Sequence, residues 1–474
     1  MTNYDQAAVW QMDRDHFIHP YSDFSRFQSE GSQIVTQARG VHVFDSTGKS
    51  YLDGIAGLWC VNIGHGRKEM ADTISRQVLE MQYYNPFGHS TNVPASVLAA
   101  KLAELTPGTL DHVFFSSGGS TANDAAVRIV HFYFNQLGKP RKKKIISRID
   151  GYHGATYVAA SLTGIHATKY GFDAVAEDLI HHVSAADMYC GSRGMGEAAY
   201  CDYLVREFED RILQLGPDNV AAFIAEPIMG AGGVLVAPDG YHRRIYEICK
   251  KYDMLYIADE VVTGFGRLGE WFASETLYGY VPDILVVAKG ITSGYVPLGA
   301  TILSAHVHDV ISRPQCENGL FSMGFTYSGH PVACAAALTA IGITENENIL
   351  SHVREVGPYL QNRAAELTKH QIVGDVRGSH LMLGVELVAD WESKTGFAPA
   401  QRAGEIVFQA CRDAGLIVRP IGNRVVLSPP LTVTKEDCDV IVDTLSQAIE
   451  KVTPALLREG EATSTGQGGM VRHG

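Results

Sequence analysis

MLYIADEVVTGFGR (254–267) and DILVVAKGITSGYVPLGA (283–300) decide the fold, because each opens with an apolar run that stops at charged residues. The first run predicts a buried strand ending at Asp259, and the second predicts one ending at Lys289. A carboxylate or an amine is costly to bury without a partner. Ligands bind at the carboxyl ends of strands in open α/β sheets. These two side chains therefore indicate either a buried ion pair or a functional site.

Four further apolar runs lack polar alternation and predict strands of the same kind, which implies a sheet covered on both faces. Stretches at 120–137 and 240–252 predict helices between them. This alternation of strands and helices favours the α/β class, with a mainly parallel, doubly wound sheet. The four runs are HVFFSS (112–117), KKIISR (143–148), VAAFIAE (220–226) and GATILS (299–304).

The two ends of the chain differ from the middle. VHVFDSTGKSYLD (41–53) alternates around a Ser-Thr-Gly turn and predicts a β-hairpin. Beyond residue 345, helical stretches around two apolar segments indicate a smaller α+β unit. We therefore expect residues 59–345 to form a large domain, and residues 1–58 and 346–474 to form one small domain together.

Composition excludes several classes of protein. A formal charge of −13 disfavours nucleic-acid binding, which needs clustered Lys and Arg. No apolar run reaches the roughly 18 residues of a membrane span, and the N-terminus is too acidic for a secretory signal. The eight cysteines are dispersed without a CxxC pair, which indicates reduced thiols and no metal site. We expect a cytoplasmic protein.

FFSSGGSTANDAAVR (114–128) predicts a strand, a glycine pair and the start of a helix. Free backbone N–H groups at such a start can hold a phosphate, and Gly118 and Gly119 let the backbone approach it. The same sequence is also compatible with an ordinary loop and helix cap, so this segment alone leaves both interpretations open.

GFGRLG (264–269) matches the dinucleotide-binding pattern GxGxxG and follows a strand. The next residues, EWFASETLYGY, are a poor start for a crossover helix, and no acid-tipped strand follows at the expected distance. The match therefore does not predict NAD binding.

Seven ordered motifs resemble those of class III (ω-amino) aminotransferases, which are fold-type I enzymes dependent on pyridoxal 5′-phosphate (PLP), and the resemblance covers about residues 20–450. Within that family the chain looks closest to amine:pyruvate enzymes, the ω-transaminases. The resemblance implies a large domain with a mainly parallel seven-stranded sheet and a small α+β domain. The motifs are GLWCVNIGHG (57–66), SGGSTANDAA (117–126), GYHGAT (151–156), AEPIMGAGG (225–233), ADEVVTGFGR (258–267), AKGITSGYVPLGA (288–300) and GFTYSGHPVA (324–333).

The resemblance also implies roles around the cofactor. Lys289 would form the Schiff base and shuttle the substrate proton, and Asp259 would pair with the pyridine N–H. His153 is expected to support its loop rather than to take part in the chemistry. The remaining cofactor contacts would be Tyr152 and Val261 on the two ring faces, Gly119 and Ser120 at the phosphate, Glu226 near the phenolic edge, and Thr326 reaching in from a second subunit.

On the substrate side, Arg419 in GLIVRPIGN matches a mobile arginine that binds the keto acid's carboxylate and swings away for amines without one. Tyr21, Trp59 and Phe87 correspond to the aromatic walls of the substrate pockets. Val262 stands where many relatives carry glutamine, which agrees with the amine:pyruvate subgroup. Thr121 stands where Glu is frequent, so the phosphate contact there depends on the backbone and Ser120.

The expected reaction has two steps. An amine donor, either a primary amine or an ω-amino acid, converts PLP to pyridoxamine phosphate, and pyruvate or another small keto acid then takes the amino group. The expected assembly is a homodimer or higher oligomer with a shared active site. The same fold also supports decarboxylation and aminomutase chemistry, and a PLP-binding protein without turnover is a further alternative.

Overall fold

A seven-stranded sheet forms the centre of the computed structural model, which describes residues 5–173, 176–313 and 320–466, with side chains up to Arg458. Neighbouring strands are parallel except β12, which is antiparallel to both of its neighbours. The predicted mainly parallel sheet is therefore confirmed. The strand order is β4 (Leu110–Ser116), β12 (Gly299–Ser304), β11 (Ile284–Val287), β10 (Leu255–Asp259), β7 (Val220–Ala225), β5 (Lys144–Arg148), β6 (Ile180–Val183).

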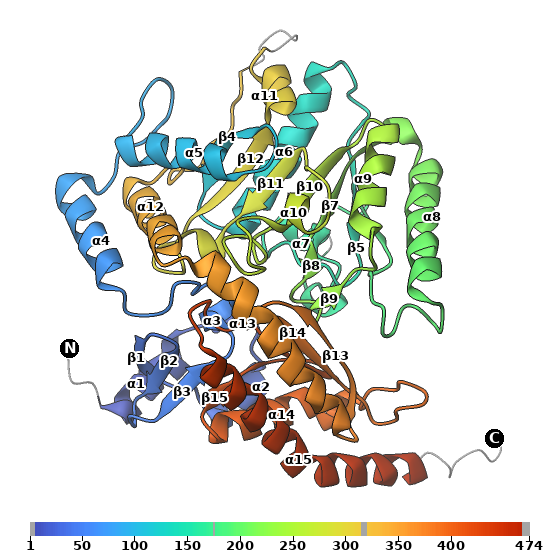
Figure 1. Cartoon of the computed structure of the whole chain (residues 1–474). Coiled ribbons are helices and arrows are strands. Elements are labelled where there is room, and N and C mark those ends of the chain that lie inside the picture. The colour runs from blue at the N-terminus through green and yellow to red at the C-terminus, as the bar shows by residue number, and fades with distance from the viewer. Residues whose placement is uncertain (1–4, 174–175, 314–319, 467–474) are drawn as a thin grey trace.

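Helices cover both faces of this sheet, as Figure 1 shows. The strands are apolar on both sides because each side packs against a helical layer. One layer contains α6 (Gly119–Gln136), α7 (Tyr157–Leu162) and α11 (Ala305–Ile311). The other contains α5 (Val93–Leu105), α8 (Glu197–Leu215), α9 (Tyr241–Lys251) and α12 (Pro331–Asn346).

Two smaller sheets lie below the large one in Figure 1 and combine both ends of the chain. The first contains β1 (Val35–Arg39), β2 (His42–Asp45), β3 (Ser50–Asp53) and β15 (Leu416–Ile417), and β2 and β3 form the predicted hairpin. The second contains β13 (Val373–Ser379), β14 (Met382–Leu387), β17 (Arg424–Leu427) and β16 (Arg419–Ile421). The helices beside them are α13 (Ile349–Ala364), α14 (Ala403–Asp413) and α15 (Lys435–Gly466).

The parallel pairing of β15 with β3 joins the C-terminal part of the chain to the N-terminal part. The division of the chain at residues 58 and 345 stays a prediction.

Among the residues that the structure describes, no helix is long and apolar enough to cross a membrane.

The adjacent strands β10 and β11 determine where chemistry can occur. They run parallel, with Asp259 opposite Val286, so Asp259 and Lys289 emerge at the same edge of the sheet. This edge is the carboxyl end of the parallel strands, where open α/β sheets bind ligands.

Arg267 ties this edge to distant parts of the chain. Its side chain is fully buried and donates hydrogen bonds to the carbonyl of Leu381 (3.4 Å), the carbonyl of Pro429 and Asn62 Oδ1 (3.1 Å). Burial lowers the pKa of its guanidinium to about 9. These bonds connect the loop after β10 with the segments around Asn62, β14 and β17.

Arg267→Met should lower the free energy of unfolding by about 3 kcal/mol, because buried carbonyls then lose their donor. Denaturant titration measures the effect. Arg243→Met is the matched control, since that arginine is exposed and pairs only with Glu247 on the same helix. Equal stability of the two variants would contradict the linking role of Arg267.

Candidate active site

Asp259 is buried at the end of β10 and is surrounded by hydrogen-bond donors. Its Oδ2 accepts a bond from Asn123 Nδ2 (2.8 Å) and lies 2.7 Å from His153 Nδ1. Its Oδ1 accepts a bond from the backbone N–H of Val261 (3.2 Å). Hydrogen-bond donors of this kind hold a buried carboxyl group in a fixed orientation, which suits it to face a cationic group.

Glu260, the next residue, has a structural role and does not face the site. It accepts hydrogen bonds from the N–H groups of Ala273 (2.8 Å) and Ser274 (2.9 Å) and from the hydroxyl of Thr263 (2.9 Å). Consecutive strand residues point to opposite faces, so Glu260 fixes the 273–274 turn and only Asp259 contacts Asn123 and His153.

Lys289 follows β11 in an unusual backbone conformation, with φ at 47°. Non-glycine residues rarely adopt positive φ, and such strain is concentrated at functional sites. Burial lowers the pKa of its amine, and the charges of Asp259 and Glu226 oppose that shift. In the part of the chain that the structure describes, no hydrogen bond holds this amine, so it is available to react.

Glu226 connects the end of β7 to the Tyr152 loop. Its Oε1 accepts a hydrogen bond from Tyr152 N (2.9 Å), and its Oε2 accepts one from Gly230 N (3.0 Å). Burial raises the pKa of its carboxyl group. Glu226 therefore fixes the backbone at Tyr152, the residue expected on one face of the cofactor ring.

The start of α6 has the properties of an anion site. Gly118 caps the helix without a side chain, and among the described residues no acceptor pairs with the N–H groups of Gly119, Ser120 and Thr121. A Cβ at Gly119 would lie 3.2 Å from both Val261 methyl groups, so glycine permits close packing there. Ser120 Oγ accepts a bond from Ala155 N (3.1 Å). Unpaired donors at a helix N-terminus fit a phosphate.

Arg419 lies half-buried on β16 near the hydroxyls of Tyr152 and Tyr21. Burial lowers the pKa of its guanidinium, and the two tyrosines oppose the shift. Within the described residues it forms no ion pair or side-chain hydrogen bond. Tyr21 is largely exposed, and its hydroxyl donates to the Tyr152 hydroxyl (3.3 Å).

The predicted aromatic wall residues Tyr21, Trp59 and Phe87 do not all lie together in the described chain. Trp59 is buried in an apolar cluster with Ile228 and Met382. Phe87 is about half exposed and lines a cavity of about 400 Å³ with Phe114, Phe321 and Met323. Thr326 is exposed, and its carbonyl accepts a bond from Tyr83 (2.6 Å). No contact among the described residues joins Phe87 or Thr326 to Asp259 or Lys289.

The GFGRLG segment folds back on itself. Phe265 N donates to Trp271 O (2.7 Å) and Gly266 N donates to Glu270 O (3.0 Å). The segment is therefore a tight loop and does not begin a helix, so the N–H groups of a dinucleotide site are not formed.

The residues present fit PLP. The unpaired donors of α6 suit its phosphate, Asp259 suits a protonated pyridine nitrogen, Val261 supplies an apolar wall, and the Lys289 amine is unpaired. Comparison with known proteins agrees: the family model described as Aminotransferase class-III matches residues 26–449. The chain belongs to the class-III aminotransferases. Enzymes of this family depend on PLP.

This class-III aminotransferase has well-covered relatives. It is 40% identical over 454 residues to a putrescine–pyruvate aminotransferase of Pseudomonas aeruginosa, covering 95% of this chain and 98% of the relative. It is 41% identical over 444 residues to a diaminobutyrate–2-oxoglutarate transaminase of Halomonas elongata, covering 92% and 94%. These relatives favour transamination over the decarboxylase and aminomutase alternatives.

Solved structures agree with this assignment. An (S)-enantioselective ω-transaminase from Thermomicrobium roseum superposes with a TM-score of 0.92 at 40% identity, covering 95% of this chain and 99% of the other. An ω-transaminase from Pseudomonas jessenii in complex with PMP gives 0.92 at 37% identity, covering 94% and 99%. The resemblance inferred from the motifs is confirmed.

His153 and Asn123 are the contacts of Asp259 that the sequence did not reveal. His153 was expected only to support its loop, yet its ring contacts the Asp259 carboxylate directly. The sequence gives one indication of a special role for Asn123: it is a polar residue on the face of α6 where Ala122, Ala125 and Ala126 are buried.

The lowered pKa of Lys289 makes the capture of PLP by the apo-protein a test of the site. Capture needs the neutral amine, so its rate should rise with pH around a midpoint below the ordinary lysine value of about 10.4. Arg419→Met should move this midpoint upward, because the Arg419 charge disfavours protonation of Lys289. Stopped-flow absorbance measures both. Arg243→Met should leave the midpoint unchanged, and an unshifted midpoint for Arg419→Met would contradict the electrostatic coupling.

Proposed function

We propose that this class-III aminotransferase moves the amino group of a primary amine or ω-amino acid to pyruvate or another small keto acid. Arg419 carries the proposal. A half-buried guanidinium without a carboxylate partner in the described part of the chain is suited to bind the carboxylate of a keto acid through two hydrogen bonds. An amine donor without a carboxylate does not need this contact.

The roles of the other residues follow from their surroundings. Bound PLP supplies the electron sink that makes the substrate's carbon acidic. Lys289 holds the cofactor and then carries a proton to and from that carbon, which its lowered pKa assists. Asp259 would face the pyridine nitrogen and favour its protonated form. Tyr152 and Val261 would contact the ring, Gly119 and Ser120 would bind the phosphate, and Glu226 fixes the Tyr152 loop.

The relatives support the substrate class. One relative's name pairs putrescine with pyruvate, and the neighbouring structures are ω-transaminases. Val262, which stands where many relatives carry glutamine, agrees with an amine:pyruvate enzyme. Putrescine is therefore the first donor to test, because it is a primary amine that lacks a carboxylate.

We further propose that the site is shared between two subunits of a homodimer. Thr326 and Phe87 are exposed, and among the described residues neither contacts Asp259 or Lys289, which suits residues that act on a partner's site. Large exposed apolar side chains in the same stretches of sequence, residues 79–93 and 320–327, also favour a subunit interface. These are Leu79, Tyr84, Val93, Leu320 and Tyr327.

The domain division and the location are proposals of the same kind. The pairing of β3 with β15 supports a small domain built from residues 1–58 and 346–474, beside a PLP-binding domain of residues 59–345. The seven cysteines that the structure describes are all free thiols. They support a reducing compartment such as the cytoplasm.

Putrescine and pyruvate should give alanine in proportion to the pyruvate consumed, without release of CO₂. Arg419→Met should lower kcat/KM for pyruvate roughly 10- to 100-fold, because a charge-assisted contact is lost. The single-turnover reaction of the PLP form with putrescine should stay nearly unchanged. Absence of alanine with every donor tested would refute the function, and equal loss in both half-reactions would refute the role of Arg419.

Mixing two inactive variants tests the shared site. A subunit with Lys289→Ala and a subunit with Thr326→Glu should form hybrid dimers in which one of the two sites has both native residues. Activity should therefore appear when the two proteins are unfolded and refolded together, and not when each is refolded alone. If Thr326→Glu alone is fully active, or if the mixture stays inactive although hybrids form, the shared site is refuted.

A further inference from the structure

The sheet of β13, β14, β17 and β16 has two different faces. Leu383, Val385, Val425 and Leu427 point into the core formed with α13, α14 and α15. The register pairs Glu386 with both Asp375 and Arg424, and it pairs Arg424 with Ile421. Arg419 pairs with Val426, two residues beyond Arg424. Because cross-strand partners share a face and strand residues alternate, Arg419, Arg424 and Glu386 lie on the same face, opposite the core.

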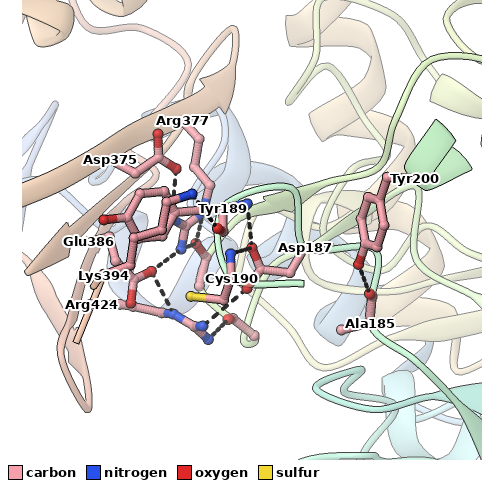
Figure 2. Close-up of polar contacts among 12 residues, drawn as sticks. Ala185, Asp187, Tyr189, Cys190, Tyr200, Asp375, Arg377, Glu386, Lys394 and Arg424 are labelled. Atoms are coloured by element: carbon pink, nitrogen blue, oxygen red, sulfur yellow. Dashed lines mark hydrogen bonds and ion pairs between the residues drawn. The ribbon is translucent and has the colours of Figure 1, made fainter. Parts of the chain in front are cut away.

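Figure 2 shows a chain of ion pairs on this face. Glu386 Oε2 accepts from Arg377 Nη2 (2.7 Å) and from Arg424 Nε (2.9 Å). Arg377 also pairs with Asp375 (3.0 Å), and Arg424 also pairs with Asp187 (3.4 Å). The side chains of Glu386 and Asp187 are 9% and 7% exposed, so the pairs are largely protected from water and salt.

The same two arginines hold a loop of the large-sheet region. Arg424 Nη1 donates to Gly232 O (2.6 Å), and Arg377 donates to Gly233 O from Nε (3.2 Å) and Nη2 (3.0 Å). The loop can lie this close because Gly384 has no side chain, since a Cβ there would lie 2.5 Å from Gly233 O. We call Arg377, Glu386 and Arg424 the clamp.

The clamped loop leads directly to the cofactor side of the site. Gly230 N donates to Glu226, and Glu226 accepts from the backbone of Tyr152. Gly232 is packed so tightly that a Cβ there would lie 2.6 Å from the carbonyl oxygen of Asp150. The clamp therefore fixes the sheet that carries Arg419 against the loop that carries Tyr152.

We propose that Arg424, Glu386 and Arg377 are positioning residues for Arg419, and that they set its distance from the bound keto acid. The inference rests on the function proposed above for Arg419. The clamp residues do not touch the substrate themselves. They hold β17, and the backbone pairing of β17 with β16 places Arg419 beside Tyr152. Their effect is therefore specific to substrates with a carboxylate.

Charge makes the clamp rigid. Burial alone would lower the pKa of the Arg424 guanidinium, but the Glu386 and Asp187 carboxylates outweigh burial and raise it. Both guanidinium groups are satisfied by carboxylates and carbonyls in fixed directions. Charge-assisted hydrogen bonds from different nitrogens of one planar guanidinium specify geometry more strongly than apolar packing does.

Arg424→Met in the PLP-loaded enzyme tests the proposal. The KM for pyruvate should rise about tenfold, because small misplacements of a binding group are costly. The half-reaction with putrescine and the absorbance of bound PLP should stay unchanged, and Arg424→Lys should restore part of the loss. Arg363→Met is the matched control, because Arg363 on α13 pairs with Glu366 in the 3-10 helix that follows (Ala365–Lys369) and with Asp439 and Asp443 on α15, and among the described residues it pairs with no clamp residue. It should leave the KM unchanged.

A double-mutant cycle shows whether the effect passes through Arg419. In the Arg419→Met background, Arg424→Met should cause no further loss of kcat/KM for pyruvate. Additive losses, or an equal loss with putrescine, would overturn the proposal. If Arg424→Met does not fold, Glu386→Gln keeps the volume and should raise the KM for pyruvate selectively, and an unchanged KM would overturn the proposal. A failure of the proposed function can be distinguished from a failure of this positioning role, because in the first case the unmodified enzyme would not use pyruvate at all.

Discussion

The Asp259 carboxylate lies at the end of a central strand where water reaches only 3% of its surface. An isolated charge at that position would be very costly, so donors must converge on it from elements far apart in sequence. Asn123 comes from α6, His153 from the loop after β5, and the Val261 N–H from its own turn. The hydrogen bonds to the Asp259 carboxylate therefore bring together the start of α6, the Tyr152 loop and Val261.

The distribution of charge follows from this constraint. Asp259 and Glu226 are the acidic groups of the site, and the start of α6, Lys289 and Arg419 supply its hydrogen-bond donors and basic groups. Burial lowers the pKa of the Lys289 amine while the two carboxylates limit the shift. A cofactor with a cationic ring and an anionic phosphate fits between these two sets of groups, and Arg419 leaves one further positive charge for a substrate anion.

Local patterns were enough to predict the strand that ends at Asp259, the strand that closely precedes Lys289, the mainly parallel sheet, and the glycine pair that opens α6. They could not decide between an ion pair and a site, and only the ordered motifs favoured a PLP enzyme. Contacts made across the fold left almost no local signal. Leu416 pairs with Leu52, Arg267 reaches Leu381 and Pro429, and Arg424 meets Glu386 only because β14 and β17 pair in one register.

Arg419 and Arg424 show how neighbouring positions can give one residue type two roles. Both lie on the same face of one sheet, and both are partly buried. Arg424 meets Glu386, Asp187 and the carbonyl of Gly232, so each of its three guanidinium nitrogens donates a hydrogen bond. Arg419 lies near tyrosine hydroxyls and has no carboxylate partner within the described residues, so under the proposed function its guanidinium would turn toward an incoming anion or away from it. A fixed strand with an unpaired side chain would then combine accurate placement with the mobility that two different substrates require.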